Sequence, residues 1–222
     1  MIARLSSESS ILEIGCGPGN ATVAFAQLGY AMTCLDPNQE FCELVRSNCM
    51  DYPKVEVHQT SFEQWNPDIV KPYDAVLAAN AFHWIAPEVK YAKAFEMLKE
   101  DGHLVLLWNL TPEPDYEVYK HLEAVYAEHA PSLVRYEGKA VQAEILEKFE
   151  QETLDSGYFE KPVIAQTTST VTYTVDDFLI LLSTLRRIEP KKKEALFRGV
   201  RERLSERITL SFLSEVQVAR RI

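Results

Sequence analysis

The sequence predicts an α/β fold built on a doubly wound, mostly parallel sheet, and three observations support this prediction. An apolar run at 11–14 ends in glycines at alternate positions, which is typical of a buried strand followed by a tight loop. Short apolar runs then alternate with helix-like stretches through the first half of the chain, which indicates crossovers between parallel strands. An acidic residue, Asp36, ends the second apolar run, where doubly wound folds hold a ribose.

The expected elements follow one another without an internal repeat. The glycine loop leads into a helix that ends at Leu28, with Asn20 as its N-cap and Gly29 in the left-handed conformation after it. A second helix is expected after Pro37-Asn38, where apolar residues recur every three or four positions. The remaining strands of this half are expected at 30–35, 55–58, 73–80 and 103–110, with a helix between the last two.

Beyond Thr111 the alternation changes, and we expect a variable helical cap at 112–190 within one domain of 222 residues. Substrate specificity is expected to lie there, because function is carried by segments added to a common scaffold. The elements expected in this half are helices from Pro112 to about 129, over 141–154, from Asp176-Asp177 to Arg187 and from Pro190, and strands over 163–175 and 208–218.

Charge and composition exclude several classes of protein. The net charge is −10, and residues 1–185 hold 12 lysines and arginines against 28 acidic residues. So acidic a body argues against nucleic acid as the main substrate. The basic segment 186–222 is interpreted as the solvent-exposed face of a helix. The alternative is that its charges steer an anion toward a binding site. No apolar stretch is long enough to span a membrane and no secretory signal is present, so a cytoplasmic location is the default expectation.

Metal and disulfide chemistry are not expected. Four cysteines lie in the first quarter of the chain without the Cys-x-x-Cys spacing, which favours reduced thiols that fill small gaps. These are Cys16, Cys34, Cys42 and Cys49. The histidines are scattered, and the closest pair on a predicted helix, His121 and His129, is two turns apart, too far for a two-ligand metal clip.

Two carboxylates indicate what the loop binds. Glu13 lies within an apolar strand, so it needs a donor or a cation near the loop, and it favours a cationic ligand over a pyrophosphate. Asp36 is placed to accept hydrogen bonds from both ribose hydroxyls. Asn20 stands where a dinucleotide fingerprint has its third glycine, and no Gly-Lys-Ser/Thr of a phosphate-binding loop is present. The alternative is that Glu13 meets a core donor and Asp36 caps the next helix.

Taken together, these motifs resemble the class I S-adenosylmethionine-dependent methyltransferases, over Ile11 to about Asn109. The residues that carry the resemblance are Glu13-x-Gly15-x-Gly17-x-Gly19, Asp36, Tyr73-Asp74-Ala75-Val76 and Leu98-Lys99-Glu100-Asp101-Gly102-His103-Leu104. A narrower likeness is to the small-molecule methyltransferases related to trans-aconitate methyltransferase. It rests on Asn80-Ala81-Phe82-His83-Trp84 and Leu106-Leu107-Trp108-Asn109. The resemblance implies a seven-stranded sheet whose last strand is antiparallel.

The resemblance also implies a set of residues that bind S-adenosylmethionine. The loop would pass under the methionine part, Glu13 would orient the loop or reach the amino group, and Asp36 would hold the ribose. Ser61 replaces the aspartate that many relatives have beside the adenine, and Glu63 is an alternative partner there. The implied cofactor-binding residues are Glu13, Gly15, Cys16, Gly17, Gly19, Asp36, Pro37, Asn38, Ser61, Phe62, Asn80 and Ala81.

For the acceptor, a small molecule, the sequence leaves roles open. A carboxylate acceptor needs no base, whereas a hydroxyl or amine acceptor needs one, and His83 is the candidate, with a structural histidine as the alternative. Trp84 and Trp108 are candidate walls of the acceptor pocket or part of the core. Arginines of the cap are candidates to bind an acceptor carboxylate, and the sequence does not show which of them, if any, faces the pocket. The candidates are Arg135, Arg186 and Arg187.

Three functions remain open at this stage. The favoured one is methyl transfer to a small molecule, and the second is a non-catalytic subunit that binds the cofactor or a partner. The third, a nicotinamide-dependent oxidoreductase, is disfavoured by Asn20 and Glu13. The resemblance implies a helical segment before the first strand, and ten residues precede Ile11 here, so either the sequence lacks its beginning or the site is more open than usual.

Overall fold

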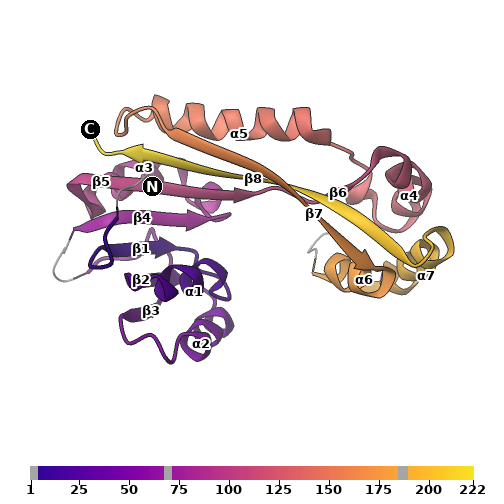
Figure 1. The fold of residues 1–222 in the computed structure, drawn as a ribbon, viewed down its shortest axis with the longest axis horizontal. Coiled ribbons are helices and arrows are strands. Elements are labelled where there is room, and N and C mark those ends of the chain that lie inside the picture. The colour runs from indigo at the N-terminus through magenta and orange to yellow at the C-terminus, as the bar shows by residue number, and fades with distance from the viewer. Residues whose placement is uncertain (1–4, 68–71, 185–189) are drawn as a thin grey trace. The chain divides into compact units, whose positions relative to one another are not determined.

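The computed structural model describes residues 5–67, 72–184 and 190–222, and the chain divides into two compact units. The first comprises residues 1–109, 146–166 and 215–222, and the second comprises 110–145 and 167–214. Figure 1 shows the parallel strands β1 to β4 in the first unit and helices α4, α6 and α7 in the second. Three long elements, α5, β7 and β8, have residues in both units.

The first unit is organised around a parallel sheet. Its strands β1 to β3 are Ser10–Ile14, Ala31–Asp36 and Val55–Gln59, and β4 and β5 are Tyr73–Ala79 and Leu98–Asn109. They hydrogen-bond in the order β3-β2-β1-β4-β5, and each strand is parallel to its neighbours in this order. The order reverses at β1, which places the carboxyl ends of β1 and β4 side by side at the switch point where doubly wound sheets bind ligands.

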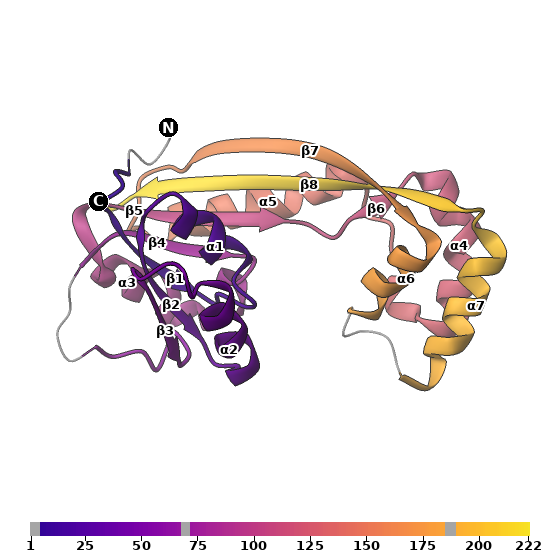
Figure 2. The same cartoon turned by 60° about the horizontal axis from the view of Figure 1, so that its bottom comes forward.

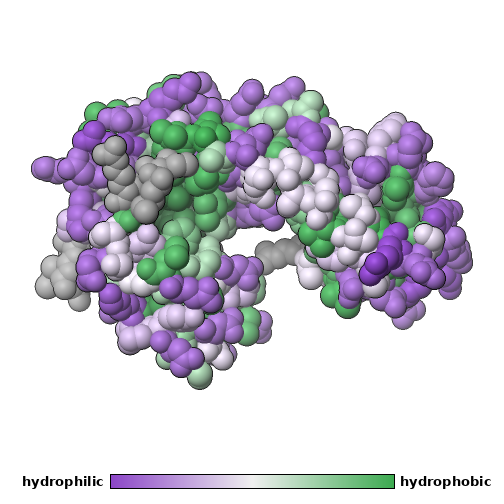
Figure 3. Space-filling view, in the orientation of Figure 1, coloured by the Kyte–Doolittle hydropathy of each residue, from purple (hydrophilic) through white to green (hydrophobic). Residues whose placement is uncertain are grey.

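Helices bury both faces of this sheet. Helix α1, Asn20–Gln27, and α2, Gln39–Asn48, lie over the face that carries Ile11, Met32 and Leu77, and they form one apolar cluster with it. Helix α3, Pro87–Met97, packs against β4 and β5, and the short 3-10 helix η1, Phe82–Trp84, precedes it. Figure 2 shows α1 and α2 together on one side of the strands. In Figure 3, apolar residues gather over the central strands of this unit, bordered by polar ones.

The sheet has eight strands rather than seven. Strand β8, Arg207–Arg220, follows β5 in the order, β6 and β7 both pair with β8, and β6 does so antiparallel. Figure 1 draws β8 running opposite to β5, as expected for a last antiparallel strand. The extra strand is β6, Glu113–Pro114, at a position predicted to begin a helix. Each proline there lacks the N–H that a helix interior needs, so the helix starts only after Pro114.

The second unit is mainly helical and has its own core. It is formed by α4, Tyr116–His129, α6, Val175–Ser183, and α7, Lys193–Arg203, with the second-unit part of β8. Helices α4 and α7 approach closely at Gly199, where an added Cβ would lie 2.9 Å from Val125 Cγ1. The remaining elements are η2, Pro131–Leu133, α5, Gly138–Asp155, β7, Val163–Thr174, and η3, Pro190–Lys192.

Two predicted helix caps are wrong by one or two residues. The N-cap of α1 is Gly19, not Asn20, because Gly19 has a left-handed φ of 92° that a residue with a Cβ resists. The N-cap of α6 is Thr174, whose Oγ1 accepts a hydrogen bond from the backbone N–H of Asp177 at 3.1 Å. Gly29 does follow α1 in the left-handed conformation, at φ 90°. Arg186 and Arg187 lie outside the described residues.

Candidate active site

The glycine loop between β1 and α1 fits tightly against the end of β4 on one side and faces open space on the other. Gly15 and Gly17 have φ of 64° and 53°. A Cβ added at Gly15 would lie 2.6 Å from Cβ of Ala81, whereas one added at Gly17 would meet nothing within 4 Å. The loop therefore needs glycine at position 15 for packing, and the space above Gly17 is open to a ligand.

Hydrogen bonds to β2 fix the path of the loop. The backbone N–H groups of Gly15 and Cys16 both donate to the carbonyl oxygen of Leu35, at 2.8 and 3.0 Å. The N–H of Gly19 donates to the carbonyl oxygen of Cys16 at 3.0 Å, which closes the turn before α1. The predicted loop residues are thus held together at the carboxyl ends of β1 and β2.

Asp36 links the loop to the start of α2. Its Oδ2 accepts a hydrogen bond from the N–H of Gly17 at 2.9 Å, and its Oδ1 accepts one from the N–H of Asn38 at 2.8 Å. Asn38 caps α2, because its Oδ1 accepts a hydrogen bond from the N–H of Phe41 at 3.2 Å. Pro37, between Asp36 and Asn38, is exposed. Each carboxylate oxygen keeps a second lone pair, so Asp36 is oriented by the backbone and still able to accept ribose hydroxyls.

Glu13 is buried beneath the loop and meets core donors. Its carboxyl group is 1% exposed, and its Oε2 accepts hydrogen bonds from Thr22 Oγ1 at 2.6 Å and Cys34 Sγ at 3.6 Å. Burial raises the pKa of Glu13 from 4.5 to about 7. The donor that the sequence demanded is therefore Thr22, on the first turn of α1. This contact lets Glu13 hold the helix against the strand, and its reach to a cofactor amino group stays a prediction.

Asn80 ties the carboxyl ends of β4 and β5 together. Its Nδ2 donates to the carbonyl oxygen of Asn109 at 3.0 Å, and its Oδ1 accepts from the N–H of the same residue at 2.8 Å. In the part of the chain that the structure describes, it is the only residue other than glycine with positive φ, at 51°. Asparagine tolerates this conformation better than most residues. The strained turn delivers Ala81 to the glycine loop.

The segment expected beside the adenine is held in a short turn after β3. Ser61 Oγ accepts a hydrogen bond from the N–H of Gln64 at 3.3 Å, and Phe62 is 2% exposed. Glu63 accepts from the N–H of Ala86 at 3.3 Å, and its pKa is lowered by hydrogen bonds to its carboxylate. The Ser61 hydroxyl and the Glu63 carboxylate are thus both used by neighbouring backbone, and an adenine contact by either residue stays a prediction.

An aromatic cluster follows Ala81 on the same edge of the sheet. The rings of His83 and Trp108 are 5.7 Å apart, and Phe149 of α5 stacks on Trp108 at 4.2 Å and 21°. Trp108 is 3% exposed and forms part of the core, whereas Trp84 is 80% exposed. Phe149 was not among the predicted site residues, although it stands on the apolar stripe expected for that helix.

Partial burial and the nearby charge of Lys90 both lower the pKa of His83, so its imidazole is neutral at neutral pH. The Nε1–H of Trp108 is buried and has no hydrogen-bond partner among the described residues. The cluster therefore contains a neutral imidazole, two residues after the Ala81 that packs against Gly15, and one buried N–H without a partner in the described chain.

Comparison with known proteins finds similarity to methyltransferases. Residues 11–102 match the family described as the methyltransferase domain. This part of the chain, which carries the glycine loop and Asp36, is therefore similar to methyltransferase domains. An uncharacterised methyltransferase of Mycobacterium tuberculosis is 28% identical over 103 residues, which are 46% of this chain and 41% of that protein. The matched segment thus spans about two fifths of the relative's length.

Solved structures share the fold of nearly the whole chain. A putative type II methyltransferase from Anaeromyxobacter dehalogenans has a TM-score of 0.64 at 16% identity, with 95% of this chain and 89% of that one covered. Geranyl diphosphate C-methyltransferase from Streptomyces coelicolor, in complex with Mg²⁺, geranyl diphosphate and S-adenosyl-L-homocysteine, has a TM-score of 0.51 at 13% identity, with 98% of this chain and 75% of that one covered.

No helix among the described residues is long and apolar enough to cross a membrane.

Proposed function

We propose that the protein transfers the methyl group of S-adenosylmethionine to a small molecule, at a carboxylate or hydroxyl oxygen, like the small-molecule methyltransferases related to trans-aconitate methyltransferase. The observation that carries the proposal is the loop geometry: Gly15 packs on Ala81 while the space over Gly17 is open, next to the oriented carboxylate of Asp36. An adenosine ligand fits this arrangement, because the loop gives it bare backbone and Asp36 accepts from its ribose.

When bound, S-adenosylmethionine supplies an electrophilic methyl group on a positively charged sulfur. The chain's own residues bind and align: the loop and Asp36 hold the nucleoside, and Asn80 and Ala81 form the wall beside it. Alignment of the reacting atoms and exclusion of water are worth about 7–11 kcal/mol at best in reactions of this kind. The carboxylate of Asp36 also favours a cationic ligand over an anionic nucleotide.

His83 is the candidate base for a hydroxyl acceptor. Because the pKa of His83 is lowered, its imidazole is neutral at neutral pH and a ring nitrogen is available to accept a proton. It lies two residues after Ala81 and beside the aromatic rings of Trp84 and Trp108. A carboxylate acceptor is already a nucleophile and needs no proton removed.

A screen of carboxylic acids, phenols and amines with labelled S-adenosylmethionine tests the proposal. We expect transfer of label to at least one oxygen acceptor. If that acceptor is a hydroxyl, His83→Gln lowers kcat by about 10²- to 10⁴-fold. If it is a carboxylate, the variant leaves kcat nearly unchanged. His121→Gln, which alters an exposed histidine in the second unit, is the matched control.

Two outcomes of the screen distinguish the alternatives. Tight cofactor binding without turnover on any acceptor would contradict the proposal of an enzyme and favour a non-catalytic cofactor-binding subunit. Transfer to nucleic acid but to no small molecule would overturn both the acceptor class and the inference drawn from the acidic body, residues 1–185, which hold 12 lysines and arginines against 28 acidic residues.

A further inference from the structure

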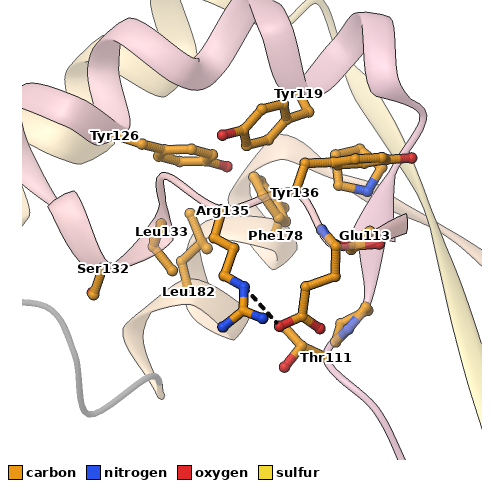
Figure 4. A pocket seen from close by; sticks show the side chains of 13 residues that line it. Thr111, Glu113, Tyr119, Tyr126, Ser132, Leu133, Arg135, Tyr136, Phe178 and Leu182 are labelled. Carbon is orange, nitrogen blue, oxygen red and sulfur yellow. Dashed lines mark hydrogen bonds and ion pairs between the residues drawn. The ribbon is translucent and has the colours of Figure 1, made fainter. Parts of the chain in front are cut away.

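The second unit contains a pocket of its own, separate from the residues of the methyltransferase domain. Figure 4 shows it between α4, α6 and the segment that leads into α5. Its volume is about 110 Å³. The residues that line it come from 111–114, 119–137 and α6, all within the second unit.

The inner wall of the pocket is aromatic and aliphatic. Tyr119 and Tyr126 come from α4, and Phe178 and Leu182 come from α6. All four are nine-tenths or more buried, with exposures of 4–6%. Tyr136 closes the side, with its ring 5.2 Å from that of Tyr119. These walls suit an apolar, flat ligand, since offset and edge contacts stabilise aromatic rings at such distances.

The acidic side chains at the pocket are already used by the protein. Glu113 accepts hydrogen bonds from the N–H groups of Glu137 and Gly138, at 2.7 and 3.0 Å, and so fixes the start of α5. Glu137 pairs with Arg135, with 3.4 Å between Oε1 and Nε. Neither carboxylate is therefore an open partner for a cation.

Two hydroxyl groups at the pocket have no partner in the part of the chain that the structure describes, and one guanidinium group there is accessible. Within the described residues, the hydroxyl groups of Tyr119 and Tyr126 have no hydrogen-bond partner, although both side chains are buried, and Figure 4 shows them directed toward each other at the pocket wall. The guanidinium of Arg135 pairs with Glu137 at 3.4 Å, and this pair leaves it accessible to a ligand. Its side chain is 69% exposed and stands at the pocket's mouth.

We propose that this pocket binds a small aromatic monocarboxylate, with its ring between the tyrosines and Phe178 and its carboxylate on Arg135. The pocket volume of about 110 Å³ is somewhat smaller than the roughly 150 Å³ of an apolar cavity that holds benzene. One ring therefore fits if its carboxylate extends out through the open side of the pocket toward Arg135. The charge fits a carboxylate, because the guanidinium presents a fork of donors that matches two oxygens. A ring hydroxyl would reach the unpaired tyrosine hydroxyls.

Calorimetry of the full-length protein without cofactor tests the proposal, with benzoate, its neutral isostere benzamide and the cation benzylamine as probes. We expect benzoate to bind and benzamide to bind at least tenfold more weakly. Failure of benzoate to bind, or a preference for benzylamine, would overturn the proposal. Because the cofactor is left out, this result does not depend on whether the protein transfers methyl groups.

Variants identify the pocket as the place of binding. Arg135→Gln is expected to weaken benzoate at least tenfold while the melting temperature stays unchanged, because Arg135 is exposed. Arg201→Gln is the matched control: it removes an exposed arginine that pairs with Asp176 at 2.9 Å and should leave affinity unchanged. Leu133→Trp, at the half-buried wall, should block binding. Equal affinity in Arg135→Gln and wild type would refute the assignment.

Discussion

Gly15→Ala is expected to lower the free energy of unfolding by about 3 kcal/mol, from left-handed strain of about 1–2 kcal/mol plus overpacking of similar size. The added Cβ would lie 2.6 Å from the Cβ of Ala81, at φ 64°. Either the loop or the end of β4 must move to relieve this overlap. Because both form the proposed cofactor site, affinity for S-adenosylmethionine should fall by at least about 100-fold.

Gly17→Ala separates strain from packing and serves as the matched control. Gly17 is also left-handed, at φ 53°, but its added Cβ would have nothing within 4 Å. It should lose only about 1–2 kcal/mol of stability. Its methyl group would nevertheless enter the space assigned to the ligand, so cofactor affinity should still fall. Urea unfolding and calorimetry measure the two effects, and equal destabilisation by both variants would contradict the packing of Gly15 on Ala81.

Glu13→Gln is expected to remove a loss of stability that the wild type shows as the pH rises from 4.5 to about 7. The folded protein holds the proton of Glu13 up to about pH 7, whereas the unfolded chain releases it near 4.5. In that window the folded state binds more protons, so the wild type is fully stabilised below pH 4.5 and loses roughly 3 kcal/mol as the pH reaches the folded pKa. Glutamine has no such proton to lose and can still accept from Thr22.

Urea unfolding of both proteins across pH 4 to 8 measures this difference. The curve for Glu13→Gln should rise relative to the wild type through the window and then run parallel to it. Glu56→Gln, which alters an exposed carboxylate on β3, is the control and should follow the wild type. Parallel curves for Glu13→Gln and wild type throughout would show that the carboxyl group titrates normally.

The first half of the fold follows closely from its sequence because the signals are local. Glycines at alternate positions require a tight loop, and Gly29 ends α1 as expected. The strands expected at 55–58 and 73–80 lie at 55–59 and 73–79. The eight-stranded, mostly parallel sheet confirms the predicted fold class, and the similar solved structures share it.

The rest depends on contacts that spacing does not reveal. Cap residues shifted because backbone conformation at Gly19 and a side-chain bond at Thr174 decided them. The partner of Glu13 was expected as a cation or donor, and the donor, Thr22, is nine residues away on another element. Phe149 reaches Trp108 only through the packing of α5. Arg135 was one of three arginines named as candidates to bind an acceptor carboxylate, and only the structure shows the aromatic pocket beside it.

Calorimetry of S-adenosylmethionine with the intact protein and with Asp36→Asn tests the central claim most directly. Asp36 joins Gly17 to Asn38 and is the proposed ribose partner. The account predicts one saturable site per chain in the wild type and at least about tenfold weaker binding in the variant, equal to about 1.4 kcal/mol. No binding by the wild type, or equal affinity in both proteins, would contradict it.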